Sequence, residues 1–169
     1  MKTIPAGHTR RLARRNAGGK GYLLMLTIHA KRLRDGARLP TRGSADAAGC
    51  DLYACLDESV TIAPHETAKI GTGLSLAVPE GYFGAVFARS GLASREGVRP
   101  ANCVGVCDSD YRGEYTVAIH NDSEFIREIN NGDRIAQLVI LPFLPAEFDE
   151  VEELDTTERG VGGFGSTGR

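Results

Sequence analysis

Long apolar runs are absent from this sequence of 169 residues. The longest extend from Tyr22 to Ile28 and from Leu138 to Leu141, whereas a helix that crosses a bilayer needs about 18 to 20 apolar residues. This excludes a membrane-spanning helix and predicts a soluble protein without a membrane partner. The sequence also lacks repeats with a period of about 20 to 50 residues, which argues against a propeller or a solenoid.

Cysteine is scarce, and its spacing is not that of a zinc site. The four cysteines are Cys50, Cys55, Cys103 and Cys107, and neither pair has the C-x2-C spacing that structural zinc sites usually show. All four lie within apolar stretches, so we expect them to be small buried hydrophobic residues. Reduced thiols are typical of a cytoplasmic protein, which is the location we expect.

Acidic residues are missing from the first 34 positions, which carry nine Lys and Arg. Residues 35–169 carry the other 11 basic and all 22 acidic side chains, a difference of 11 negative charges. We expect residues 1–24 to be a disordered basic leader, with Met25 as a possible alternative start. A nucleic-acid-binding arm or a targeting segment is the alternative, and we expect no nucleic-acid partner except through this leader.

Helical periodicity longer than ten residues is also missing, although Ser90 to Gly97 could form a short helix. Short alternating segments bounded by turn residues such as Pro64, Gly81 and Gly132 predict strands instead. The predicted strands are Leu23–Ile28, Gly49–Cys55, Val60–Ile62, Ala68–Val78, Tyr82–Phe87, Cys103–Cys107, Tyr115–His120, Phe125–Ile126 and Ile135–Leu141. The fold class is therefore all-β, and we expect residues 25–150 to form a β-barrel or a jelly-roll-like sandwich.

The stretch from Gly105 to Glu114 sets acids and an aromatic residue between glycines, at the end of an apolar run. Cys103–Cys107 is predicted to be a buried strand that pairs with Tyr115–His120, so residues 108–114 should form the turn of a hairpin. Such a turn can hold the Asp108 carboxylate and the Tyr111 ring in fixed geometry. The alternative is a solvated acidic turn, because Asp and Gly are common turn residues.

Three further segments suit phosphate or its counter-ions. Arg89, Ser90 and Gly91 follow a predicted strand and combine a cation, a hydroxyl and backbone N–H groups. Asp51 is a lone acid early in a strand, where a turn or edge position would be more usual. Residues 151–169 are predicted to be a flexible arm whose glycines, with Arg159, can form an anion-binding nest; a disordered terminus is the alternative. The spacing of Gly160, Gly162 and Gly165 matches the dinucleotide-binding fingerprint, but no strand precedes it, so we reject that interpretation; the arm also nearly spells a P-loop, but the Lys is missing.

Taken in order, five blocks of this sequence resemble the homotrimeric dUTP diphosphatases. The blocks are Ala48–Leu52, Arg89–Leu92, Gly105–Gly113, Gly132–Leu138 and Arg159–Thr167. The resemblance covers residues 26 to 168, and an ordered set is far more specific than any single block. Cys50 and Cys107 stand where that family commonly has a larger residue, which concerns packing more than chemistry.

The resemblance implies hydrolysis of dUTP to dUMP and pyrophosphate, which keeps uracil out of DNA and supplies dUMP for dTMP synthesis. Asp108 would be the general base that activates water for attack on the α-phosphorus. Tyr111 would pack under the deoxyribose and leave no room for a ribose hydroxyl. Asn102, with backbone groups of Gly105 and Val106, would bind the uracil edge.

The resemblance also implies a phosphate and metal side of the site. Arg89, Ser90 and Gly91 would hold the phosphates, and Gln137 would contact the triphosphate directly or through water. Asp51 would hold Mg²⁺ through water, in keeping with the reluctance of that ion to lose its hydration shell.

Finally, the resemblance implies a homotrimer with shared active sites, in which the C-terminal arm closes over a neighbouring site. Phe164 would stack on uracil and Arg159 would meet the terminal phosphate, while Gly165, Ser166 and Thr167 would complete the closure.

Three other functions remain open at this level. A dCTP deaminase would share the barrel, but the turn from Asp108 to Tyr111 favours the diphosphatase. A binding module could use the fold without catalysis. The basic leader could bind RNA.

Overall fold

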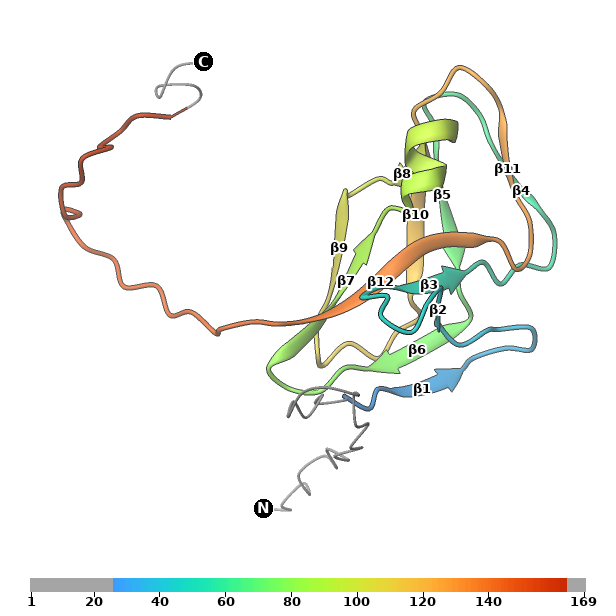
Figure 1. The fold of residues 1–169 in the computed structure, drawn as a ribbon, viewed down its shortest axis with the longest axis horizontal. Coiled ribbons are helices and arrows are strands. Elements are labelled where there is room, and N and C mark those ends of the chain that lie inside the picture. The colour runs from blue at the N-terminus through green and yellow to red at the C-terminus, as the bar shows by residue number, and fades with distance from the viewer. Residues whose placement is uncertain (1–25, 164–169) are drawn as a thin grey trace, which may run out of the picture.

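The computed structural model describes residues 26–163, and nearly all of its regular structure is β (Figure 1). The elements of this part of the chain are β1 (His29–Arg32), β2 (Thr41–Arg42), β3 (Cys50–Tyr53), β4 (Val60–Ile62), β5 (Thr67–Gly71), β6 (Leu74–Ala77), β7 (Tyr82–Phe87), the single-turn π-helix η1 (Leu92–Glu96), β8 (Val98–Pro100), β9 (Val104–Cys107), β10 (Thr116–Asn121), β11 (Arg127–Ile129) and β12 (Arg134–Pro142). No helix in residues 26–163 has the length and apolar character that crossing a membrane requires.

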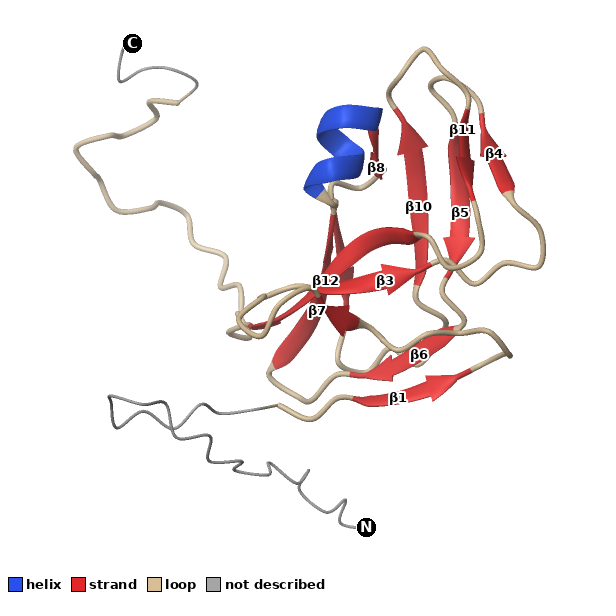
Figure 2. Cartoon of the chain, turned by 45° about the vertical axis from the view of Figure 1, so that its right-hand side comes forward, coloured by secondary structure: helices blue, strands red, loops and turns tan. Residues whose placement is uncertain are grey.

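All strand pairings within residues 26–163 are antiparallel. The largest sheet has the order β2-β3-β12-β7-β9, a second has the order β5-β10-β8, and β1 with β6 and β4 with β11 form two ribbons. In Figure 2 the sheets surround a common interior. Its largest fully buried apolar side chains are Leu52, Ile62, Ile70, Leu74, Leu76, Ile119 and Ile135, each of which stabilises the fold by about 1.5 to 3 kcal/mol. The all-β prediction is confirmed.

Several predicted strands agree with the structure in position. Val60–Ile62 and Tyr82–Phe87 have the predicted bounds, as β4 and β7. The strands predicted at 49–55, 115–120 and 135–141 occur as β3, β10 and β12 with ends that differ by one or two residues. The short helix predicted from Ser90 is present as η1 and the turn before it, and it ends at Gly97, whose φ is 68°.

The single strand predicted at 68–78 is wrong, because the chain breaks there into β5 and β6. Gly73 has a φ of 67°, which is outside the range of a strand. A β-carbon at Gly73 would lie 2.8 Å from the β-carbon of Ala37 and 3.0 Å from Sγ of Cys55. The break therefore depends on a close approach between segments that are distant in sequence, which an alternating pattern does not reveal.

Two other strand predictions miss their places. The first described strand is β1 from His29, whereas the prediction was Leu23–Ile28, of which residues 23–25 lie outside the described part. Phe125 and Ile126 are not in a strand, and they are 70% and 68% exposed. The buried amide of Asn121 donates to the Phe125 carbonyl over 2.7 Å, which holds this segment as a loop before β11. The short strands β2 and β8 were not predicted, since they have little apolar alternation.

The cysteines are free thiols, but they differ in burial. Cys55 is buried, Cys50 and Cys107 are half-buried, and Cys103 is exposed. The expectation of four buried hydrophobic residues is thus wrong for Cys103, because it lies in the turn before the edge strand β9 with a φ of 58°. Within residues 26–163, no group of three or more His, Cys, Asp or Glu is placed to hold a metal ion.

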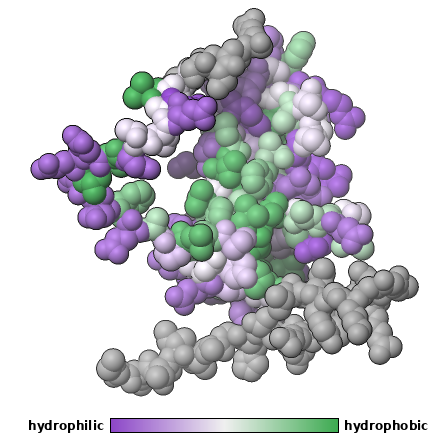
Figure 3. All heavy atoms as spheres, turned by 60° about the vertical axis from the view of Figure 1, so that its left-hand side comes forward, coloured by the Kyte–Doolittle hydropathy of each residue, from purple (hydrophilic) through white to green (hydrophobic). Residues whose placement is uncertain are grey.

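After β12 the chain leaves the barrel, as Figure 1 shows. The last anchor is Phe143, whose N–H donates to the Gly81 carbonyl and whose ring meets that of Phe83 edge-on. Residues 143–163 contain no strand or helix. In the space-filling view of Figure 3 this segment is mainly hydrophilic, with scattered apolar side chains. Phe148 and Leu154 of this segment are exposed.

Candidate active site

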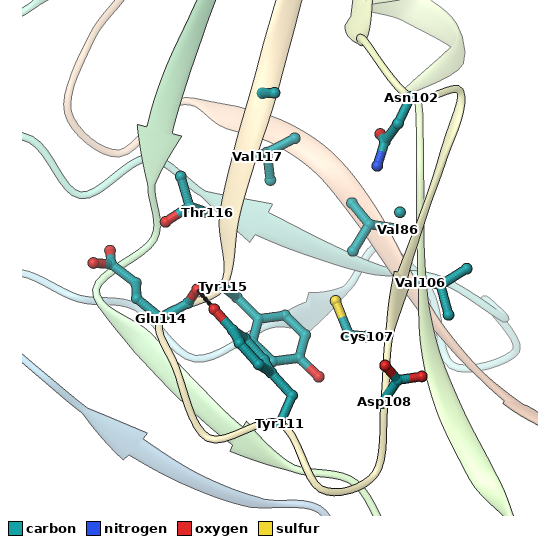
Figure 4. A pocket seen from close by; sticks show the side chains of 12 residues that line it. Val86, Asn102, Val106, Cys107, Asp108, Tyr111, Glu114, Tyr115, Thr116 and Val117 are labelled. Atoms are coloured by element: carbon teal, nitrogen blue, oxygen red, sulfur yellow. Dashed lines mark hydrogen bonds between the residues drawn. The ribbon is translucent and has the colours of Figure 1, made fainter.

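The loop from Asp108 to Tyr115 joins two strands that do not pair with each other. β9 pairs with β7, whereas β10 pairs with β5 and β8. The predicted hairpin is therefore wrong, and the two strands separate to border a cavity of about 290 Å³ (Figure 4). Its lining residues are Val86, Asn102, Gly105, Val106, Cys107, Asp108, Tyr111, Glu114, Tyr115, Thr116, Val117 and Ala118. Five predicted substrate or catalytic residues thus meet in one cavity.

Asp108 is the first residue after β9, and its carboxylate is exposed at the cavity. The Asp108 carbonyl accepts the N–H of Tyr111, which closes the first turn of the loop. The Asp108 carboxylate has no hydrogen bond or ion pair to any residue in 26–163. A carboxylate in this state is available to accept a proton from water.

Tyr111 forms one wall of the cavity, and three contacts hold its ring. Its hydroxyl donates to the Glu114 carbonyl over 3.0 Å. Its ring packs against that of Tyr115, with the centroids 6.0 Å apart. The ring also lies across Gly113, where a β-carbon would overlap it. An aromatic surface of fixed position can exclude a substituent from a sugar that packs on it.

The strand β9 is not buried as predicted, because it is an edge strand. Val106 is 64% exposed and Val104 is 39% exposed. An edge strand leaves backbone N–H and C=O groups unpaired on its outer side, and these groups of β9 lie at the cavity. Gly105 allows close approach here, since a β-carbon would lie 3.2 Å from that of Val86.

Asn102 lies at the end of the cavity opposite Tyr111 (Figure 4). It belongs to the tight turn before β9, and its carbonyl accepts the N–H of Val104. Its side-chain amide carries both donors and an acceptor, which is the complement that a uracil edge requires.

Asp51, Arg89 and Gln137 form a second group, outside this cavity. Asp51 is buried in the middle of β3, opposite Gln137 of β12, rather than in a turn or at an edge. Its Oδ1 accepts from Nε of Arg89 at 3.2 Å and from Nε2 of Gln137 at 3.4 Å. Its Oδ2 accepts from Arg134 at 3.3 Å. Two cations therefore compensate one buried carboxylate.

A β-bulge brings Arg134 to this group. Between Arg134 and Ala136 the register of β12 on β3 shifts by one residue. Arg134 and Gln137 are three residues apart and would face opposite sides of a regular strand. The extra residue turns both side chains toward Asp51.

Ser90 and Gly91 begin the turn that leads into η1, beside Arg89. Arg89 borders a second cavity of about 300 Å³, whose other lining residues include the cations Arg127 and Arg134 and the acids Glu96, Glu128 and Asp133. Arg89, which is predicted to bind phosphate, thus lines a different cavity of the chain from the residues predicted to bind the nucleoside.

The described residues do not form a cage for a directly bound Mg²⁺. Asp51 is the only acid of its group, and both of its oxygens accept hydrogen bonds. These bonds are 3.2 to 3.4 Å long, and a carboxylate has about four lone-pair sites, so capacity for a water molecule remains. Asp51 therefore fits a contact to Mg²⁺ through water and not a direct ligand.

The arm lies partly inside the described residues. The Arg159 side chain donates to the Gly162 carbonyl over 2.8 Å and is exposed. Phe164, Gly165, Ser166 and Thr167 lie outside the described residues.

Four residues near these cavities had no role in the sequence analysis. Glu114, Tyr115 and Cys107 line the first cavity, and Arg134 contacts Asp51. Glu114, Cys107 and Arg134 stand within or beside the motif blocks, which is the one signal that could have found them. Burial raises the pKa of the Tyr115 hydroxyl and that of the Cys107 thiol above their usual values.

A family model described as dUTPase matches residues 35–168. The deoxyuridine 5′-triphosphate nucleotidohydrolase of Syntrophotalea carbinolica is 50% identical over 145 residues, which cover 85% of this chain and 97% of the relative. The enzyme of the same name from Paraburkholderia xenovorans is 45% identical over 147 residues, which cover 86% and 98%.

Solved structures show the same relationship. The dUTPase of Staphylococcus bacteriophage 80alpha with dUpNHpp has a TM-score of 0.78 and 33% identity, and the match covers 86% of this chain and all of that one. A mutant dUTPase from phage phi11 of S. aureus, described with a coordinated structural Mg(II) ion, has a TM-score of 0.67 and 31% identity over 76% of this chain and 98% of that one. By its sequence blocks, its barrel and these relatives, the chain belongs to the dUTPase family.

Proposed function

We propose that this protein hydrolyses dUTP to dUMP and pyrophosphate. The observation that carries the proposal is the cavity between β9 and β10, in which the exposed Asp108 carboxylate and the fixed Tyr111 ring face the same space (Figure 4). The membership in the dUTPase family supports it.

Asp108 is the general base in this proposal. Its carboxylate accepts a proton from a water molecule, and the water oxygen forms a bond to the α-phosphorus. The bond from the α-phosphorus to the oxygen bridging to the β-phosphate breaks, and pyrophosphate leaves with that electron pair. A positioned general base accelerates such a reaction by about 10²-fold to 10⁴-fold.

The cavity walls account for the choice of nucleoside. Asn102 and the outer backbone edge of β9, at Gly105 and Val106, bind the uracil edge. Tyr111 packs under the deoxyribose and leaves no space for a 2′-hydroxyl. A site that excludes a group in this manner gains selectivity from the clash rather than from additional contacts.

The second group binds the triphosphate. Arg89 offers a guanidinium, Ser90 a hydroxyl and Gly91 a backbone N–H, and Gln137 reaches the phosphates directly or through water. Mg²⁺, when bound to the phosphates, neutralises their charge and orients them. Asp51 holds this ion through a water molecule.

A homotrimer with shared sites completes the active site. In one chain Arg89 lines a separate cavity from the residues proposed to bind the nucleoside, and the segment that carries Arg159 extends away from its own barrel (Figure 1). Both facts suit a closed ring in which each site is assembled from several chains. The arm, with Arg159, Phe164, Gly165, Ser166 and Thr167, then covers the nucleotide of a neighbour. The free thiols support a cytoplasmic location.

The proposal is tested by incubating the purified protein with dUTP, UTP, dTTP and dCTP, with and without Mg²⁺, and measuring pyrophosphate and ammonia. We expect strong preference for dUTP and a loss of rate without Mg²⁺. Equal hydrolysis of UTP would contradict the role of Tyr111. Ammonia from dCTP would identify a deaminase, and binding of dUTP without turnover would identify a binding module.

A further inference from the structure

The side chain of Glu114 joins the loop of residues 108–115 to two segments that are distant in sequence. Its Oε1 accepts from Arg34 at 2.8 Å and from the Gly73 N–H at 2.7 Å. Its Oε2 accepts from the other terminal nitrogen of Arg34 at 3.1 Å. Arg34 also donates to the Cys55 carbonyl over 2.9 Å. One carboxylate thus connects the loop, the segment after β1 and the corner between β5 and β6.

This contact is more than a mobile surface ion pair. The Glu114 side chain is only 25% exposed, and Arg34 binds it with the two-pronged geometry in which guanidinium pairs are most specific. The bridge lies directly on Gly71, where a β-carbon would be 2.5 Å from both Arg34 and Glu114. The hydrogen bond to Glu114 raises the pKa of Arg34.

Glu114 also makes one of the three contacts that hold the Tyr111 ring. The backbone carbonyl of Glu114 accepts a hydrogen bond from the Tyr111 hydroxyl, and Glu114 itself lines the cavity between β9 and β10. β9 and β10 do not pair, and the loop is held to the corner by the Glu114 carboxylate and to β6 by two bonds of 2.8 Å, from the Tyr115 N–H to the Leu74 carbonyl and from Ser75 Oγ to the Arg112 carbonyl. A shift of the Glu114 backbone therefore moves the hydrogen-bond acceptor of the ring, and Figure 4 shows this bond at the edge of the cavity.

We propose that the Arg34–Glu114 pair is a positioning device for Tyr111, and that it determines how strictly the site rejects a ribonucleotide. This inference rests on the proposed hydrolysis of dUTP and assigns a specificity role to two residues outside the motif set. Neither residue touches the reacting atoms. A displacement of about 1 Å in an active site can change a rate by up to about a hundredfold, so loss of the pair opens space for a 2′-hydroxyl.

A purely structural role would give a different result. If the pair only stabilises the barrel, its removal would lower the amount of folded protein and leave the selectivity of the folded molecules unchanged. The ratio of kcat/KM for dUTP to kcat/KM for UTP, measured on one preparation, cancels the folded fraction. This ratio is therefore the readout, with the melting temperature recorded beside it.

The variants are Glu114→Ala, Glu114→Gln, Arg34→Met and Arg34→Lys. We expect Glu114→Ala and Arg34→Met to lower the dUTP-to-UTP ratio about tenfold or more. Glu114→Gln should have a smaller effect, because an amide oxygen can still accept from Gly73, and Arg34→Lys should restore part of what Arg34→Met loses. The control is Glu124→Gln, which alters the exposed hydrogen bond with His65 on another loop, and its ratio should equal that of the wild type.

A fifth variant tests the route through the ring. Tyr111→Phe keeps the ring and removes the hydroxyl that bonds to Glu114. If the pair acts through this bond, adding Glu114→Ala to Tyr111→Phe should lower the ratio no further. Full additivity of the two changes would contradict the route.

The outcomes separate the two proposals. A wild type that does not hydrolyse dUTP, or that hydrolyses UTP equally well, refutes the proposed function before any variant is made. A selective wild type whose ratio stays within twofold in both Arg34→Met and Glu114→Ala refutes the positioning role alone. If Glu114→Ala does not fold, Arg34→Met, which keeps the bond from Gly73, decides the question.

Discussion

Nε of Arg89, just after the end of β7, donates to Oδ1 of Asp51 in β3 over 3.2 Å. Both strands belong to the five-stranded sheet. The Asp51 side chain is 7% exposed and that of Arg89 is 22% exposed. A residue proposed to bind phosphate is therefore held in place by the residue proposed to reach Mg²⁺. The residues proposed for phosphate binding and for metal binding therefore belong to one hydrogen-bonded group, in which a change at either residue alters the other.

Replacement of Asp51 tests this unit. In Asp51→Ala the Arg89 and Arg134 cations lose their shared acceptor, and removing one member of a buried pair is strongly destabilising. Allowing for the partial exposure of both arginines, we expect the free energy of unfolding to fall by about 2 to 3 kcal/mol. Urea unfolding measures this. Asp122→Asn, which removes the more exposed bidentate pair with Arg99, is the control and should cost under about 1 kcal/mol.

Replacement of Asp108 tests the base. Asp108→Asn keeps the size and polarity of the side chain but removes the proton acceptor, and no residue in 26–163 depends on that carboxylate for a hydrogen bond. We expect turnover of dUTP to fall by about a hundredfold or more, with nucleotide affinity and melting temperature unchanged. Steady-state kinetics measures the turnover, and calorimetric titration with a non-hydrolysable dUTP analogue measures the affinity. Unchanged turnover would mean that another group is the general base, and Asp110 would be the first residue to test.

Tyr115 gives a prediction about stability. Its hydroxyl is buried beside Cys107 and has no hydrogen-bond partner among residues 26–163 (Figure 4). Leaving such a group unpaired costs about 1 to 3 kcal/mol. We therefore expect Tyr115→Phe to raise the free energy of unfolding by about 1 kcal/mol at neutral pH, as measured by urea unfolding. A decrease would show that the contact with the Cys107 thiol is a stabilising hydrogen bond.

The same tyrosine predicts a dependence on alkaline pH. Burial raises the pKa of Tyr115 above its usual value, so the folded protein holds this proton more tightly than the unfolded chain does. Below about pH 10, the pKa of an exposed tyrosine, the hydroxyl is neutral in both states; above it the unfolded chain loses the proton first, and the free energy of unfolding falls. Cys107, whose pKa burial also raises, acts in the same direction from about pH 8.5. Unfolding free energies compared between pH 7 and pH 11 should fall less in Tyr115→Phe than in the wild type; an equal fall would contradict this assignment.

Mixed trimers test the shared site. We expect co-folding of inactive Asp108→Asn protein with an inactive chain truncated after Glu158 to restore activity. Each mixed trimer can combine an intact base with an intact arm from another chain. With equal random mixing, about a quarter of the sites should be complete if the ring is closed and heterologous. Absence of recovery, with mixed trimers confirmed by native mass spectrometry, would place base and arm in the same chain.

Local pattern alone predicted much of the barrel. Val60–Ile62 and Tyr82–Phe87 have their predicted bounds, because short runs of strand-forming residues next to turn residues such as Pro64 and Gly81 are a local signal. The five blocks indicated the family, since an ordered set of short motifs is specific even without coordinates. They also contain Asp108 and Tyr111, and the resemblance named Asn102; the fold brings all three to one cavity.

Tertiary structure alone decided which strands became neighbours. The pattern around Asp108 predicted a hairpin, yet β9 pairs with β7, and β10 pairs with β5 and β8, so a cavity lies between them. The choice of partner depends on the competition among all available strand edges, which no local window contains. The bulge that turns Arg134 toward Asp51 and the bridge from Arg34 to Glu114 have the same origin. Both join residues about 80 positions apart in sequence, and only the closed barrel determines that they meet.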